Sequence, residues 1–394
     1  MMEVLYDAAT RIRSDRVNTW KENGGRVVGY TCSYVPSEVF HASGILPYRI
    51  RGIETESMEI ADAYFGPYIC TFPKCVLQLA GKGKYNFLDG AIITPGCDSM
   101  RRLDECWRKA GDTIPGIVPP FFYYFDVPHK STGHGSRWFR QEIVNLIAAL
   151  EQQFGVKVTD EKLHDSIRLY NKGRALLKEL EDLRAKDVVT ISGTDAFAVA
   201  MAGTAMPRDE YTKHLENLVD ELKKKKSKSK DTRKRIMIIG SISDDLSLVQ
   251  LVEESGQAVV VAENLCFGVR DEGNVVDESG DPVDALGKAY LGESTCPRMY
   301  GKYKERLATL KSIIERSRVD AVVMQNIRFC DLHGSENGLF ERDLEKEGIP
   351  CIRLEREYGP LVETGRLRMR IDAFFERLYS HPSRQETVHD MEAV

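Results

Sequence analysis

Short apolar runs of strand length alternate with helical patterns along this chain, and this alternation restricts the possible folds more than any other feature. The apolar runs occupy residues 26–30, 45–50, 88–94, 117–125, 235–240, 258–262, 321–325 and 351–354. Segments with helical spacing separate them. Alternating strands and helices imply a mainly parallel sheet with helices on both faces. We therefore predict an α/β fold with two doubly wound (Rossmann-like) domains.

The length of 394 residues fits two domains better than one core. We expect an N-terminal α/β domain over 1–137, a helical segment with a Lys-rich linker over 138–230, and a C-terminal α/β domain over 231–394. The linker prediction depends on residues 223–230 (KKKKSKSK), which include no apolar residue. A lysine run without interleaved aromatics is typical of solvated chain rather than of a nucleic-acid site. Near the N-terminus, the spacing from Leu5 to Trp20 predicts one helical face.

Charge and hydropathy exclude several classes of protein. The net charge of −5 and the pI near 6.0 give no global reason to expect a nucleic-acid partner. Residues 1–20 lack the apolar region of a secretory signal, and no apolar run approaches the roughly 20 residues that span a bilayer. We expect a cytoplasmic protein that does not enter membranes. Thiols stay reduced in that compartment, so the nine cysteines indicate metal or redox chemistry rather than disulfides.

The positions of six cysteines are informative under this fold. Cys32, Cys97, Cys266 and Cys330 each follow the carboxyl end of an expected strand, where open α/β sheets place their ligand crevice. Cys70 and Cys296 lie in loops that lead into expected helices. A helix N-terminus favours the thiolate, which is the form that binds metal. These six are the candidate ligands of a shared site.

The other three cysteines have simpler interpretations. Cys351 lies within a strand pattern and Cys106 on a helical pattern, where a free cysteine is usually a small buried apolar residue. Cys75 stays open, because four residues separate it from Cys70, a spacing that could place both near one helical turn. No CxxC pair is present, so spacing alone does not identify a cluster, and a non-redox zinc protein is a lower alternative. Residues 240–243 (GSIS) lack both nucleotide-binding fingerprints, so an ATP-driven step would need a partner.

Three segments together resemble the 2-hydroxyacyl-CoA dehydratase and benzoyl-CoA reductase subunit family. They are residues 29–38 (GYTCSYVPSE), 95–103 (PGCDSMRRL) and 329–333 (FCDLH). The resemblance extends over nearly the whole chain in matching order. It implies a two-domain subunit with an oxygen-sensitive iron–sulfur cluster. It also implies a separate ATP-hydrolysing iron–sulfur activator protein that supplies single electrons.

Within this superfamily, the cysteine count suggests a branch. The resemblance implies three cysteines for one 4Fe-4S cluster in the CoA-ester enzymes, and six for the bridged 8Fe-9S cluster of the double-cubane proteins. Cys32, Cys70, Cys97, Cys266, Cys296 and Cys330 match the double-cubane pattern, with three thiols from each cluster-binding domain. A homodimer fits this branch, and a heterodimer with a paralogous subunit fits the CoA-ester enzymes.

Proton donors are harder to select from the sequence. A substrate held at an open cluster face would need one, and Glu38, His333 and Tyr34 are near the candidate ligands in sequence. His333 could also be a ligand, and we favour its interpretation as a polar turn residue. The substrate itself is not indicated.

Overall fold

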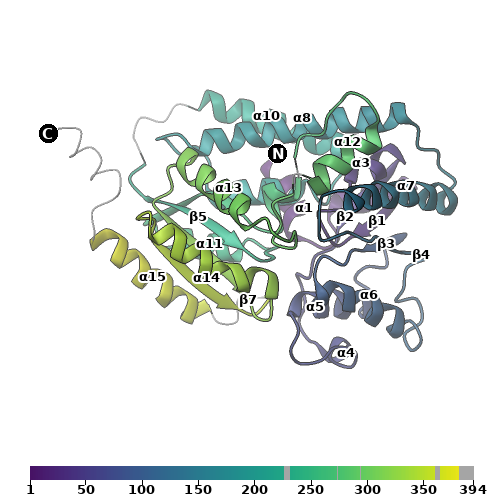
Figure 1. The fold of residues 1–394 in the computed structure, drawn as a ribbon, viewed down its shortest axis with the longest axis horizontal. Helices are drawn as coiled ribbons and strands as arrows, with labels where there is room; N and C mark the ends of the chain where they lie inside the picture. The colour runs from purple at the N-terminus through teal and green to yellow at the C-terminus, as the bar shows by residue number, and fades with distance from the viewer. Residues whose placement is uncertain (226–230, 273, 293, 360–363, 381–394) are drawn as a thin grey trace.

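The computed structural model describes residues 1–225, 231–272, 274–292, 294–359 and 364–380. It contains two four-stranded sheets, each entirely parallel and each flanked by helices (Figure 1). The strand orders are β2-β1-β3-β4 and β6-β5-β7-β8, so the two sheets repeat one topology. The predicted α/β class with two doubly wound units is confirmed.

The N-terminal sheet forms from the expected apolar runs. Its strands are β1 (Arg26–Tyr30), β2 (Ile45–Arg49), β3 (Gly90–Ile93) and β4 (Phe121–Tyr124). Its helices are α3 (Ser37–Ala42), α4 (Glu59–Asp62), α5 (Thr71–Gly81) and α6 (Asp98–Ala110). Neighbouring strand residues point to opposite faces. Val27 therefore packs in one apolar cluster with α5 and α6, and Val28 in another with α3 and the later helix α7 (His134–Phe154).

The C-terminal sheet follows the same rule. Its strands are β5 (Lys234–Gly240), β6 (Ala258–Asn264), β7 (Ala321–Ile327) and β8 (Cys351–Arg356). Its helices are α11 (Ser247–Glu253), the 3-10 helix η1 (Gly268–Glu272), α13 (Tyr303–Arg316), α14 (Asp331–Glu345) and α15 (Thr364–Ser380). Ile236 and Ile238 face α11 and α15, whereas Met237 and Ile239 face α13 and α14.

Helices connect the two sheets and also cross between them. The connecting helices are α7 (His134–Phe154), α8 (Asp160–Arg184), α9 (Gly193–Ala202) and α10 (Arg208–Lys224). The later segment with α12 (Pro282–Gly287) and the π-helix η2 (Lys288–Gly292) packs against α7 and so joins the core of the N-terminal sheet. Cys296 follows this segment, so a cysteine from the C-terminal half of the chain lies against the N-terminal sheet.

Two local expectations differ from the structure. The helix expected from Leu5 to Trp20 is divided into α1 (Met2–Thr10) and α2 (Asp15–Glu22). The buried guanidinium of Arg51 donates to the carbonyls of Ala8 and Ala9, which ends α1, and Ser14 caps the start of α2. We expect the linker to begin at Lys223, but α10 continues to Lys224. Residues 226–230 of the expected linker lie outside the described residues.

Each sheet has a topological switch point between its two central strands. In the N-terminal sheet the loops after β1 and β3 carry Cys32 and Cys97, and in the C-terminal sheet the loop after β7 carries Cys330. The strand order reverses its direction there, which opens the crevice that binds ligands in this class of fold. Within the described residues, no helix has the length and apolar character needed to cross a membrane.

Candidate cluster site

Three of the six candidate cysteines are the N-cap residues of helices. They are Cys70 at α5, Cys97 at α6 and Cys330 at α14, and we name them the N-cap thiol group. Burial raises the pKa of each thiol, to about 11 at Cys330. The backbone amides in the first turn of each helix act in the opposite direction and favour the thiolate.

The N-cap thiol group draws on both sheets. All three cysteines pack against one apolar cluster. Burial is the largest cause of the raised pKa of Cys70, and the negative charge of Cys330 raises this pKa further. These two thiols therefore lie within electrostatic reach of each other. Cys97 feels the Cys330 charge in the same way. Cys70 and Cys97 precede helices of the N-terminal sheet and Cys330 one of the C-terminal sheet, so this group crosses the boundary between them.

Cys32, Cys266 and Cys296 form a second set, which we name the arginine-flanked thiol group. Cys32 and Cys296 pack against the same apolar cluster beside α3 and α7. Burial raises the pKa of Cys32 to about 11, and the negative charges of Cys296 and Cys266 contribute to this rise. Burial also raises the pKa of Cys266, while Arg270 and Arg49 oppose it by favouring the thiolate. This group also combines residues from both halves of the chain.

The two groups belong to one site. The charge of Cys32 contributes to the raised pKa of Cys97, and a Cβ built on Gly96 would lie 3.2 Å from the Cys32 sulfur. The backbone before Cys97 therefore lies against Cys32. In contrast, the sulfur of Cys106 donates to the Tyr64 carbonyl and that of Cys351 to the Ile349 carbonyl.

Cys75 lies in the middle of α5 and is fully buried. Its surroundings are Thr55, Asp244 and Lys74, although its charge also raises the pKa of Cys70 slightly. Since its helical position directs it towards Gly52 rather than towards the helix start, it lies at the margin of the site.

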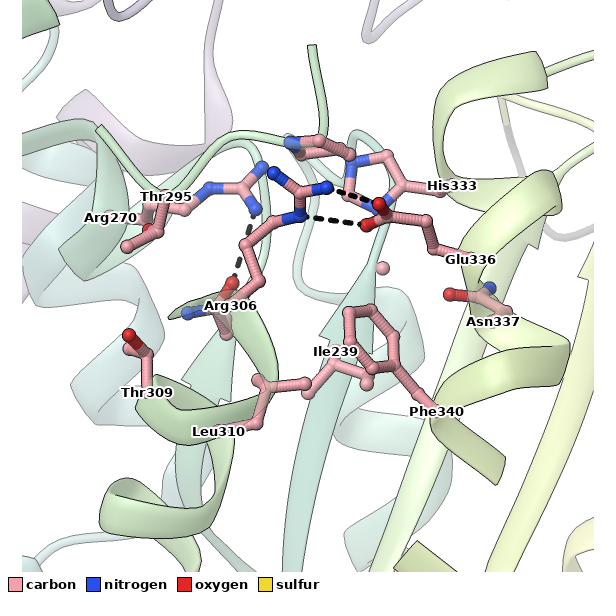
Figure 2. A pocket seen from close by; sticks show the side chains of 13 residues that line it. Ile239, Arg270, Thr295, Arg306, Thr309, Leu310, His333, Glu336, Asn337 and Phe340 are labelled. Atoms are coloured by element: carbon pink, nitrogen blue, oxygen red, sulfur yellow. Dashed lines mark hydrogen bonds and ion pairs between the residues drawn. The ribbon is translucent and has the colours of Figure 1, made fainter. Parts of the chain in front are cut away.

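Arg270 is a site residue that the sequence did not single out. Its Nη2 donates to the Cys266 sulfur at 2.9 Å, and its Nη1 donates to the Asn264 side chain at 3.1 Å. Figure 2 shows Arg270 beside Arg306, with His333 across from them. An arginine four residues after a cysteine carries no spacing signal of its own, because η1 is needed to fold it back.

The three predicted proton donors occupy different places. His333 lies on α14 with its Nε2 3.9 Å from the Cys266 sulfur, and burial with two arginines lowers its pKa well below the usual value. The Tyr34 hydroxyl accepts from Ser294 at 2.9 Å, and burial together with the nearby Cys296 charge raises the pKa of Tyr34. Glu38 is fully buried, 2.6 Å from Arg174, in contacts that favour a structural role.

A cavity of about 550 Å³ opens beside Cys296. Tyr34, Arg270 and the small α13 side chains Thr309 and Ser312 line it, with Glu181 at another wall. Burial raises the pKa of Glu181, Arg316 lowers it and Glu263 raises it again. The cavity therefore offers both a cation and a carboxyl group of raised proton affinity next to a candidate cluster ligand.

The donor set can be tested against the group that the resemblance implies. Among the described residues, no three His, Cys, Asp or Glu side chains converge on a single ion, as a closed zinc site would require. Six thiols, one buried and five partly buried, whose negative charges would repel one another as thiolates, would instead be stabilised by a cationic cluster that several of them share. The residues present fit an iron–sulfur cluster better than a single metal ion.

Comparison with known proteins decides the family. The family model described as 2-hydroxyglutaryl-CoA dehydratase, D-component, matches residues 32–378, a span that includes all six candidate cysteines. The chain belongs to this family. This match confirms the predicted resemblance. The chain is therefore part of an enzyme of the dehydratase or reductase type.

Individual relatives of this chain carry related names. A benzoyl-CoA reductase subunit of Thauera aromatica is 29% identical over 84% of this chain and 86% of that protein. The (R)-phenyllactyl-CoA dehydratase beta subunit of Clostridium sporogenes is 26% identical, over 91% and 93%. The beta subunit of (R)-2-hydroxyglutaryl-CoA dehydratase from Acidaminococcus fermentans is 22% identical, over 91% and 94%. These relatives are subunits, so this chain is a component of an enzyme of that kind.

Proposed function

We propose that this chain is the reductase component of a cytoplasmic iron–sulfur system. It would receive low-potential electrons from a separate ATP-hydrolysing activator and reduce a small substrate. The cofactor would be a double-cubane (8Fe-9S) cluster, and the active form would be a homodimer.

One observation carries this proposal, namely the division of six thiols into two adjacent groups of three. Cys70, Cys97 and Cys330 share one apolar cluster, and Cys32 and Cys296 share the other. Cys266 lies within electrostatic reach of Cys32 and Cys296, and also of Cys97 and Cys330, so it adjoins both groups. Three thiolates per cubane is the ligand count that two bridged cubanes need. Chain order alone predicts one trio from each domain; the geometry instead favours two trios that each combine both halves of the chain.

The residues around the thiols would have distinct tasks. Helix N-termini would stabilise the N-cap thiol group as thiolates, and Arg49 and Arg270 would do so at Cys266. A bound cluster would supply single electrons at a strongly negative potential. The cavity beside Cys296 would hold the substrate, with Tyr34 kept protonated at its wall.

A second candidate function is a subunit of a 2-hydroxyacyl-CoA dehydratase or benzoyl-CoA reductase with one 4Fe-4S cluster. The names of the relatives favour it. In this case three cysteines would bind iron, a paralogous subunit would complete the enzyme, and the substrate would be an acyl-CoA. A non-redox zinc protein ranks lower, since the thiols of the described residues do not converge on one ion.

Anaerobic iron and sulfide analysis of the chain expressed alone tests the proposal. We expect about eight irons per chain, on the basis of three thiolates for each four-iron unit. The variant Cys296→Ser should lose about half of that iron. About four irons, all retained in Cys296→Ser, would favour the acyl-CoA enzyme, and a colourless protein with zinc would reject both redox functions.

A further inference from the structure

We infer that the arginine-flanked thiol group binds the half of the cluster with the higher reduction potential, and that Arg270 sets this difference. The inference rests on the proposed function, because it concerns the cluster that these thiols would hold. It names a positioning residue that acts on the cluster through the Cys266 sulfur.

The first support is the contact itself. Arg270 directs Nη2 at the Cys266 sulfur over 2.9 Å, and the partner of Nη1 is the neutral Asn264 amide. A hydrogen bond from a cation to a cluster sulfur stabilises the more negative, reduced state and so raises the potential. Arg49, whose charge also favours the thiolates of Cys32 and Cys266, adds to this field.

The second support is that the chain builds this contact at a conformational cost. Gly268 has a φ of +84°, and a Cβ at this position would lie 2.8 Å from the Phe197 ring. Only glycine fits both restrictions without strain. This glycine starts η1, which turns the chain so that Arg270 folds back over Cys266, the residue four positions before it in the sequence.

The third support is that Arg270, although it borders the 550 Å³ cavity, has no carboxylate as a hydrogen-bond partner among the side chains that the structure describes. The cavity between Arg270, Arg306 and His333 measures only about 20 Å³, room for about one water (Figure 2). The adjacent Arg306 is compensated, because its Nε donates to Glu336 at 2.8 Å. Arg270 has the thiol and an amide as its hydrogen-bond acceptors within the described residues.

The N-cap thiol group has a different environment. The donors that favour its thiolates are backbone amides of Phe72, Met100 and His333. A helix N-terminus amounts to about half an elementary charge, whereas a guanidinium carries a whole one. An electron should therefore rest preferentially at the arginine-flanked group, the one whose Cys296 borders the 550 Å³ cavity.

Redox titration of the anaerobically loaded full chain, followed by its optical and electron paramagnetic resonance signals, tests this inference. Wild type should show two midpoint potentials. In Arg270→Gln the higher midpoint potential should fall by about 59 mV, which corresponds to a tenfold smaller equilibrium constant for one-electron reduction. The lower midpoint potential should not change. Arg270→Lys keeps the charge and should recover most of the shift.

Arg328→Gln is the matched control, because Arg328 lies two residues before Cys330 but is exposed and paired with Glu357. Its potentials should equal those of wild type. If Arg270→Gln does not retain iron, Asn264→Leu decides, since it releases Nη1 of Arg270 and should give a smaller shift of the same sign. Unchanged potentials in the iron-loaded variants would overturn this inference but leave the proposed function intact. A wild-type protein that binds no iron would reject the proposed function.

Discussion

The ring of Tyr68 lies edge-on to the ring of Phe329, with 5.9 Å between the ring centroids and 79° between the planes. Tyr68 precedes Cys70 by two residues and Phe329 directly precedes Cys330, so this pair joins the two chain segments that meet in the N-cap thiol group. Both rings face solvent, with 85% and 40% of their surface exposed. Phe329 also has a φ of +64°, which is unusual for an aromatic residue.

The first prediction concerns this aromatic pair. A double-mutant cycle with Tyr68→Ala and Phe329→Ala should give a coupling energy of about 0.5–1.5 kcal/mol, the usual range for an edge-to-face pair. Denaturant unfolding of the four proteins measures it. Additive effects of the two substitutions would show that the rings do not stabilise each other.

The second prediction concerns the ligands. Cys97→Ala and Cys330→Ala should each lose at least the iron bound by the N-cap thiol group, because each removes one of its three thiolates. Cys351→Ala should keep all of its iron, since the Cys351 sulfur bonds the Ile349 carbonyl beside β8. Iron and sulfide counts of the three variants under anaerobic conditions are the measurement. Equal losses in all three would contradict the assignment of ligands.

The third prediction concerns the buried pair of Glu38 and Arg174, which joins α3 to α8. Arg174→Met should lower the free energy of unfolding by about 3–5 kcal/mol, because it leaves Glu38 buried without its cation. Lys178→Met removes an exposed pair one turn along the same helix and should cost at most about 0.5 kcal/mol. If Glu38 were a proton donor instead, Glu38→Gln would lose turnover at unchanged stability.

The fourth prediction concerns Asp244, which links the two sheets by accepting from the Gly52 N–H at 2.8 Å and from the Tyr358 hydroxyl. Burial raises the pKa of Asp244 to about 6, from 3.8. A raised carboxyl pKa means that the folded state binds the proton more tightly. The stabilisation that protonated Asp244 contributes to the folded state is therefore complete below about pH 4 and is lost as the pH rises through about 6.

Asp244→Asn should remove this part of the pH dependence, about 3 kcal/mol at most between pH 4 and 6. Urea unfolding of wild type and variant across that range measures the difference. Asp372→Asn, on the exposed side of α15, is the control and should keep the wild-type slope. Parallel curves for wild type and Asp244→Asn would contradict the prediction.

The sequence predicted the strands well because most of them are apolar runs buried on both faces of the sheet, and only the edge strands β4 and β8 are partly exposed along much of their length. All eight expected strands exist, and β1 has the predicted bounds. The same reasoning placed Cys32, Cys97, Cys266 and Cys330 at strand ends. Periodicity could not separate α1 from α2, because Arg51, a residue distant in the chain, ends the first helix.

The grouping of the thiols was also beyond sequence reasoning. Chain order suggested three ligands from each domain, but the segment with α12 and η2 packs across the boundary and brings Cys296 to the side of Cys32. Arg270 was missed for a similar reason. Its role depends on the turn at Gly268 and on the Phe197 ring that restricts it, and neither is visible in local spacing.

The crossing of both thiol groups over the domain boundary has a consequence for how the protein is made. The last cysteine of the N-cap group is Cys330 and that of the arginine-flanked group is Cys296, and both are synthesised long after Cys32 and Cys70. Neither ligand set can be complete while the N-terminal half emerges from the ribosome. If these thiols bind the proposed cluster, iron insertion should therefore follow the synthesis of Cys330, and products that end before it would carry thiols but no complete ligand set.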